Sequence, residues 1–418
     1  GWRELSGGDH RILLSPDGER ACVPAGVRLS ELDRLLAPQG RLYPPDPTEM
    51  TAMLGGTIAT NASGARSYRY GATRNWVEAL LVVTTGGEAC WIRRGAYVAM
   101  GGELDLPGAF PASALSIPAL PMPRTKHAAG LYLAPEMDLV DLLIGSEGTL
   151  AVVVAAELRV VERPEPLLTL AAFLPEPQAA FSLADDVRDY ASVLSIEYFD
   201  AHALSFIRAQ YPETPDAGAC VLFEMEFAAA GRHNPYPDPA VLDRWDSLLT
   251  AHDSQANWVA TGEELRGMKA FRHALPEEVN RWVAARQGKL GTDMAVPAAA
   301  FPQMHEAYRR AQDQGIRTVL FGHLGQYHLH LNFLPEDAAG MERAQGAYRA
   351  LARRAVELGG TISAEHGVGK KTLRDETGCL RPYLFYLYGR EGIAALDGVK
   401  ATLDPQRLLN RGTMVPEA

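Results

Sequence analysis

Residues 321–332 read FGHLGQYHLHLN, with three histidines set between apolar residues. The surrounding runs TVLFGHL and HLHLNFL have the composition of two buried strands, and Gly325 marks a turn between them. His328 and His330 are two positions apart, so on a strand their side chains share a face. The stretch therefore predicts a pair of buried strands that carries histidines.

A metal or catalytic site is the alternative to a plain histidine-bearing core. One imidazole in an apolar strand is more often a hydrogen-bonded core residue. Three imidazoles, with the Glu365–His366 pair of SAEHGVGKK elsewhere in the chain, favour a shared site. Imidazole nitrogens and a carboxylate suit Zn²⁺ or a similar divalent ion, and such a set leaves coordination positions for a substrate. On the residues alone both interpretations stay open.

Length and composition limit the class of protein. A chain of 418 residues predicts two or three domains, and 47% hydrophobic with 22% charged residues is typical of a folded enzyme. The net charge of −11, without a basic stripe, argues against a nucleic-acid partner. Four dispersed cysteines form no CxxC motif, which favours a reducing, cytoplasmic setting. No apolar run of membrane-spanning length occurs, although peripheral membrane contact stays open.

The pattern of apolar and polar residues changes at the RPEP sequence, residues 163–166. Before it, short strand-like runs are broken by Gly and Pro, with a helix predicted at 29–36 and an irregular excursion at 94–123. After it, amphipathic helices alternate with strands, which predicts an α+β domain. The predicted helices are 181–190, 240–253, 276–286, 301–314 and 338–358, and the predicted strands are 221–227, 318–324 and 328–334. A helix and a turn-rich segment, LDPQRLLNRG, close the chain within 392–412.

Two glycine-rich segments of the first domain present backbone with little side-chain bulk. GGTIATNASG, residues 55–64, suits contact with a flat or anionic ligand, or alternatively a glycine turn with a helix start. It is not the GxGxxG fingerprint, so no nicotinamide cofactor is predicted. In LIGSEGTLAVV, residues 143–153, a strand is expected to enter the Gly-Ser-Glu-Gly turn and a second strand to leave it. A simple hairpin is the alternative to a ligand-binding turn.

Five motifs, in order, resemble one family. GGTIATNASG, RYGATR, IGSEGTL, GHLGQYHLHLN and ISAEHGVGK are similar to segments of the flavin-linked D-2-hydroxy acid dehydrogenases of the vanillyl-alcohol-oxidase-type fold. That family includes D-lactate dehydrogenase (cytochrome), glycolate oxidase flavin subunits and D-2-hydroxyglutarate dehydrogenase. The resemblance implies an α+β protein with a PCMH-type FAD-binding domain at 1–163. It further implies an inserted ferredoxin-like substrate domain with the metal site at 164–370, and a C-terminal segment, 371–418, that returns to the FAD domain.

The resemblance also implies roles for particular residues. The expected FAD contacts are Gly55, Gly56, Thr57, Ala59, Asn61, Gly64, Lys126, Gly130, Gly148, Thr149, Val153 and Asn410. The expected metal ligands are His323, His330 and Glu365, with zinc as the first choice and manganese or iron as alternatives. His366 is the expected catalytic base. Arg272, with Lys289 as a second candidate, would pair with the substrate carboxylate, the alternative for Arg272 being a surface helix arginine. His328 stands where the family usually has asparagine, which implies a flavin- or substrate-facing role.

The implied reaction is oxidation of a small D-2-hydroxy acid to the 2-oxo acid. The hydroxyl proton would go to the base while hydride leaves Cα for flavin N5, and electrons would pass on to a quinone or an electron-transfer protein. A homodimer stays open.

Some expected family features differ in this sequence. Members carry a glycine-rich loop of the RGGGTS kind, which wraps the FAD pyrophosphate, before the PPDP segment, and nothing here resembles it. We therefore expect an N-terminally incomplete FAD domain. Gln326–Tyr327 replace an acidic and a small residue, Ala151 replaces a glycine, and Arg411 replaces a proline. A non-catalytic metal-binding remnant without flavin is the main alternative function. A zinc hydrolase built on the metal set would leave both glycine segments unexplained.

Overall fold

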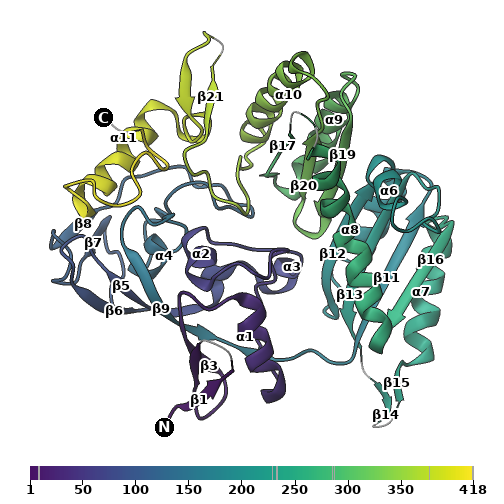
Figure 1. Ribbon diagram of the computed structural model, residues 1–418, viewed down its shortest axis with the longest axis horizontal. Coiled ribbons are helices and arrows are strands. Elements are labelled where there is room, and N and C mark those ends of the chain that lie inside the picture. The colour runs from purple at the N-terminus through teal and green to yellow at the C-terminus, as the bar shows by residue number, and fades with distance from the viewer. Residues whose placement is uncertain are drawn as a thin grey trace. The chain divides into compact units, whose positions relative to one another are not determined.

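The computed structural model describes residues 1–7, 10–227, 229–231, 234–284, 286, 288–375 and 377–416. The chain divides into two compact units, and Figure 1 colours it from the N-terminus to the C-terminus. Unit 1 comprises Gly1–Gly64, Tyr70–Arg163 and Gly359–Ala418, and unit 2 comprises Ala65–Arg69 and Pro164–Leu358. Residues 359–370, expected with the substrate domain, therefore pack with unit 1.

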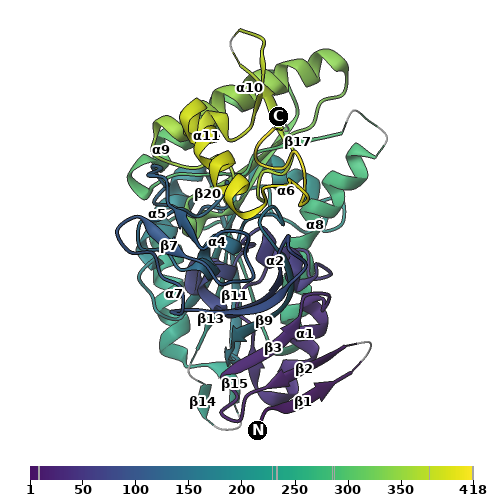
Figure 2. The same ribbon diagram turned by 90° about the vertical axis from the view of Figure 1, so that its left-hand side faces the viewer.

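Unit 1 is built on an antiparallel sheet of six strands. In order across the sheet these are β1 (Arg3–Ser6), β2 (Arg11–Leu14), β3 (Arg20–Pro24), β9 (Val152–Arg159), β5 (Val77–Val83) and β6 (Ala89–Arg93). Figure 2 shows β1, β2 and β3 side by side near the N-terminus. Leu80 and Val82 of β5 are fully buried, since alternate residues of a strand point to the same face.

Helices, two short hairpins and one further strand pair complete the described part of unit 1. The helices are α1 (Leu29–Leu36), α2 (Leu54–Ala59), α4 (Leu139–Leu143) and α11 (Phe385–Leu403). The hairpins pair β7 (Glu103–Asp105) with β8 (Ala114–Ser116) and β21 (Thr372–Arg374) with β22 (Leu380–Pro382). A long-range antiparallel pair joins β4 (Arg41–Leu42) to β10 (Val161–Glu162). The short helix α3 (Ser67–Tyr70) crosses the boundary between the two units in the sequence. α1 has the predicted bounds, because its leucines recur at helical spacing and all four are buried.

Two predictions for unit 1 were wrong in detail. The excursion at 94–123 contains the β7–β8 hairpin. The segment that enters the Gly-Ser-Glu-Gly turn is helix α4 and not a strand, because the Asp138 side chain accepts the Val140 N–H at 2.8 Å and caps the helix start. The turn therefore joins a helix to β9 rather than closing a hairpin.

Unit 2 contains an eight-stranded antiparallel sheet. Its strands are β16 (Ala256–Thr261), β11 (Leu167–Leu174), β13 (Ala219–Glu226), β12 (Val193–Asp200), β19 (Thr318–His323), β20 (His328–Phe333) and β17 (Leu290–Gly291), with β18 (Met294–Ala295) also paired to β20. β14 (Ala229–Gly231) and β15 (Asn234–Pro237) form a separate pair. The predicted strand pair at 318–334 is confirmed as β19 and β20.

Helices cover both faces of this sheet. On one face α6 (Ala201–Ile207) and α8 (Leu265–Val283) share a core with Phe173 and Phe199. On the other face Trp245 of α7 (Pro239–Ala251) packs on Phe223, with 5.1 Å between the ring centroids. The helices α5 (Pro177–Val187), α9 (Phe301–Gln312) and α10 (Ala338–Glu357) complete the unit, and Figure 1 shows α9 and α10 as neighbours. Double coverage explains why the strands read as nearly continuous apolar runs.

The predicted helix at 276–286 is corrected to α8, which begins at Leu265 and contains Pro276 in its interior. The predicted range begins at that proline. The helix continues through it because Phe271, Leu275 and Val279 form one buried stripe on both sides of the proline.

The α+β fold class is confirmed. Among the helices in the part of the chain that the structure describes, none combines the length and apolar character needed to cross a membrane.

Candidate functional site

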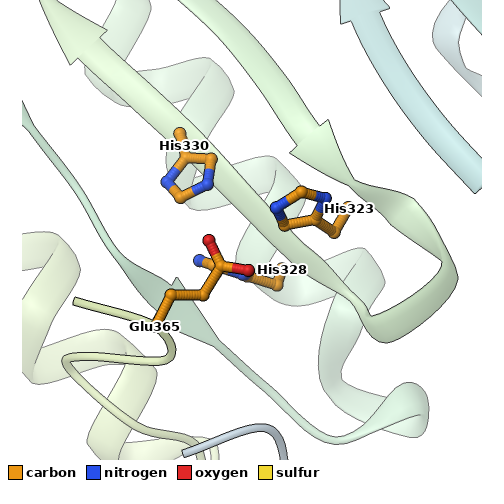
Figure 3. Close-up of side chains that lie close together, drawn as sticks. All are labelled: His323, His328, His330 and Glu365. Atoms are coloured by element: carbon orange, nitrogen blue, oxygen red, sulfur yellow. The ribbon is translucent and has the colours of Figure 1, made fainter. Parts of the chain in front are cut away.

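The three histidines of unit 2 lie on one face of the β19–β20 pair. The register sets His323 opposite His328 and Phe321 opposite His330, and directly opposed residues project to the same face. The ring centroids are 4.4 to 5.7 Å apart, and one nitrogen from each ring lies within 4.8 Å of the others. Figure 3 shows the rings gathered on these two strands. The structure thus brings together the two predicted ligands and adds His328.

Glycine is required at the bend between the strands. A Cβ on Gly325 would lie 2.7 Å from a ring carbon of Tyr68, which belongs to the same unit. Tyr327 then adopts a left-handed conformation, with φ of 53°, and returns the chain into β20. This tight turn positions His323 and His328 opposite each other.

Two of the rings have a defined tautomer. His323 Nδ1 lies 2.7 Å from Glu197 Oε1, and His330 Nδ1 lies 3.1 Å from the carbonyl oxygen of Thr292. A carboxylate and a carbonyl can only accept, so both Nδ1 atoms carry the proton. The Nε2 atoms therefore keep their lone pairs, as metal-binding imidazoles do when an oxygen acceptor orients the ring. This donor set fits a divalent metal ion.

Glu197 was missed by the sequence analysis. It is buried in β12, and its second oxygen lies 4.0 Å from Arg272 Nε of helix α8. An acidic residue within the apolar run VLSIEYFD was the signal that could have revealed it. Arg272 is largely buried, with 14% of its side chain exposed, so it is not the surface helix arginine of the alternative interpretation. Its charge faces Glu197 in this unit.

Lys289, the second candidate for the substrate carboxylate, donates from Nζ to Asn280 Oδ1 at 3.0 Å. Burial lowers the pKa of Lys289. Within the part of the chain that the structure describes, Lys289 forms no hydrogen bond or ion pair with Arg272, Glu197 or the histidines. Its role in substrate binding stays a prediction.

In unit 1 the two glycine segments lie against each other. The Gly145 N–H donates to Ile58 O at 2.9 Å and the Glu147 N–H to Ala59 O at 2.7 Å, so the Gly-Ser-Glu-Gly turn is attached to α2. A cavity of about 200 Å³ opens beside this junction. Its lining is Gly55, Ala59, Leu143, Ser146, Gly148, Ala151, Val152 and Val153. Four of the expected FAD contacts are thus at one cavity, whose small residues fit part of a flat cofactor.

Other expected FAD contacts direct their polar groups into the unit itself. The Thr57 hydroxyl donates to Leu54 O at 2.9 Å and that of Thr149 to Ser146 O at 2.6 Å. Asn61 is left-handed, with φ of 49°, accepts the Arg74 N–H at 3.0 Å and donates to a backbone carbonyl. A Cβ on Gly64 would overlap the Asp46 carbonyl. These residues stabilise the conformation of the segment itself. Gly56 differs from them, because a Cβ added at this position would have no other atom within 4 Å.

Glu147 connects three segments of unit 1. Its carboxylate accepts the N–H groups of Val368 and Gly369, each at 2.7 Å. Asn410, another expected FAD contact, donates from Nδ2 to the Glu147 carbonyl at 2.6 Å. Burial raises the pKa of the Glu147 carboxyl, and the two backbone donors oppose that shift. The turn therefore anchors the loop that presents the exposed His366.

Glu365 belongs to unit 1 and the histidines belong to unit 2. Within unit 1, the Glu365 carboxylate is ion-paired with Lys126 and accepts the Ser63 hydroxyl at 3.3 Å. Lys126, expected beside the flavin, is thus a partner of an expected metal ligand. Gly130 has φ of 89°, a left-handed conformation that favours glycine.

The chain belongs to the FAD linked oxidases. The family model for their C-terminal domain matches residues 163–414, and a model described as an FAD binding domain matches residues 5–93. Membership makes the chain an FAD-dependent oxidoreductase by class, and it confirms the family expected from the five motifs.

Three curated relatives align over nearly the whole chain. Glycolate oxidase subunit GlcD of Bacillus subtilis is 29% identical, over 96% of this chain and 77% of the relative. D-2-hydroxyglutarate dehydrogenase of Xanthomonas citri pv. viticola is 28% identical, over 94% of this chain and 75% of the relative. D-lactate dehydrogenase of Archaeoglobus fulgidus is 28% identical, over 97% of this chain and 79% of the relative.

A solved structure supports the fold. Alkyldihydroxyacetonephosphate synthase superposes with a TM-score of 0.58 at 16% identity, over 97% of this chain. The chain spans 65% of the length of that protein. At this identity the likeness concerns the fold alone.

Proposed function

We propose that this chain oxidises a small D-2-hydroxy acid to the 2-oxo acid, with FAD as hydride acceptor and a divalent metal ion at the histidines. The names of the relatives supply the substrate class: glycolate, D-2-hydroxyglutarate and D-lactate. The proposed metal site rests on one observation: the Nδ1–H groups of His323 and His330 each donate to an oxygen acceptor.

Each proposed residue has one task. FAD, when bound, accepts the hydride, and a metal ion makes the substrate hydroxyl more acidic. His323 and His330 would hold a bound metal ion through Nε2, and Glu365 would be the third ligand that the resemblance implies. Arg272 pairs with the substrate carboxylate, for which a guanidinium offers a bidentate contact. His366 takes the hydroxyl proton while hydride leaves Cα. The two electrons then pass to a quinone or an electron-transfer protein.

The flavin half is tested by the visible spectrum. We expect the purified chain, alone or after reconstitution with FAD, to show oxidised flavin absorbance. Anaerobic D-lactate, glycolate or D-2-hydroxyglutarate should bleach that absorbance, because hydride transfer reduces the flavin, and L-lactate is the matched control. A chain that takes up zinc but never FAD would contradict this function and favour the non-catalytic remnant.

Glu197→Gln is expected to weaken metal binding by about 10- to 100-fold, the usual cost of losing a carboxylate that orients a metal-binding histidine. Glutamine keeps the size of the side chain but removes the charge that faces His323 Nδ1 at 2.7 Å. Equilibrium titration of the chelator-treated protein with Zn²⁺ measures the effect.

The matched control for this variant is Glu224→Gln in the neighbouring strand β13, where the carboxylate pairs with Arg66 at 2.6 Å. Its zinc affinity should equal that of the wild type. Equal zinc affinities for both variants would remove Glu197 from the metal site.

A further inference from the structure

All three histidines of the cluster face an oxygen acceptor, not only the two expected ligands. His323 has the Glu197 carboxylate, His330 has the Thr292 carbonyl, and His328 Nε2 lies 2.9 Å from Asp293 Oδ1. His328 is also the most deeply buried of the three, with none of its side chain exposed. Its ring is 4.4 Å from that of His330, the shortest separation in the cluster.

The contact with Asp293 is an ion-pair distance, because His328 Nε2 and Asp293 Oδ1 do not meet in hydrogen-bond geometry. The position of the ring is the stronger observation. One nitrogen of His328 lies within 4.8 Å of one nitrogen of each of the other two rings. A buried imidazole at this place can therefore offer a nitrogen to an ion that His323 and His330 share.

We propose that His328 is a metal ligand, so that β19 and β20 supply three imidazoles to one ion. This inference rests on the proposed metal site and deepens it. It replaces the flavin- or substrate-facing role that the resemblance implied for His328. The positions in the strands support it, since His328 is opposite His323 and shares a strand face with His330.

A third imidazole would change the choice of metal. An asparagine at this position would offer a carbonyl oxygen, and oxygen ligands suit Mn²⁺, whereas imidazole suits Zn²⁺. With the implied Glu365 carboxylate, three histidines would give zinc four protein ligands, and a bound substrate would then make the ion five-coordinate. The substitution of histidine for asparagine should therefore favour zinc over manganese in this chain.

The test compares metal binding by wild type, His328→Asn and the control His252→Asn, all as the full chain treated with a chelator. His252 pairs with Asp186 at 2.7 Å in the same unit and resembles His328 in its carboxylate contact. We expect His328→Asn to lose at least about tenfold in Zn²⁺ affinity, as metal sites do when a single supporting group is lost. Mn²⁺ affinity should hold or rise. The visible bands of bound Co²⁺ should shift for His328→Asn and not for His252→Asn.

Zinc X-ray absorption on the wild type avoids any effect of substitution on folding. Three coordinated imidazoles support the proposal and two overturn it. Unchanged zinc affinity and an unchanged cobalt spectrum in His328→Asn would also overturn it. This holds even if the KM for the hydroxy acid changes in that variant, because such a change alone indicates a contact with the substrate and not with the metal. If His323→Ala then still abolishes zinc binding, the proposed metal site stands without His328. If the wild type binds neither Zn²⁺ nor Co²⁺, the proposed site fails as a whole.

Discussion

His366→Ala is expected to lower turnover of the hydroxy acid by about 10²- to 10⁴-fold, the usual contribution of a positioned general base. His366 lies in the loop whose next residues, Val368 and Gly369, are held by the Glu147 carboxylate. The alanine variant should keep that anchor, because the two backbone N–H groups are unaffected. Steady-state reduction of an artificial electron acceptor measures turnover, and FAD and metal content should equal those of the wild type.

The control is His10→Ala, which removes a histidine of the same unit that pairs with Glu31 at 3.0 Å. Its turnover should match the wild type. If His366→Ala turns over at the wild-type rate, another group takes the proton and the assignment of the base is wrong. Loss of FAD from His366→Ala would instead give this residue a part in cofactor binding.

His323→Ala and His330→Ala are each expected to remove most of the bound metal, because each variant deletes a nitrogen ligand that an oxygen acceptor holds in place. Elemental analysis of the purified variants measures metal per chain. Turnover should fall together with metal content, since the metal makes the substrate hydroxyl acidic. The flavin spectrum should persist.

His252→Ala, outside the cluster, serves as the control and should retain the metal. Full metal occupancy in both His323→Ala and His330→Ala would return these residues to the interpretation of hydrogen-bonded core histidines. A partial loss in one variant, with the other fully depleted, would rank the two ligands without contradicting the site.

The local sequence pattern predicted those helices and strands whose apolar spacing lies within the element itself. Leu29–Leu36 has helical leucine spacing and formed the predicted helix, and β19 and β20 formed where the apolar runs flank Gly325. The start of α8 at Leu265 was missed because Pro276 suggested a boundary that core packing overrides. The GGTIATN and Gly-Ser-Glu-Gly segments were selected from their lack of bulk, and hydrogen bonds from Gly145 and Glu147 to α2 attach them to each other.

The family, the α+β class and the strand pair with its histidines follow from the sequence, because these depend on motifs and on local periodicity. Which oxygen acceptor faces each ring depends on the tertiary structure. Glu197 is 126 residues before His323 in the chain, and the contact forms because β12 and β19 are neighbours in one sheet. Such pairings depend on sheet order and register, which a single sequence does not encode locally. For the same reason, the approach of His328 Nε2 to Asp293 Oδ1, at 2.9 Å, is visible only in the folded chain.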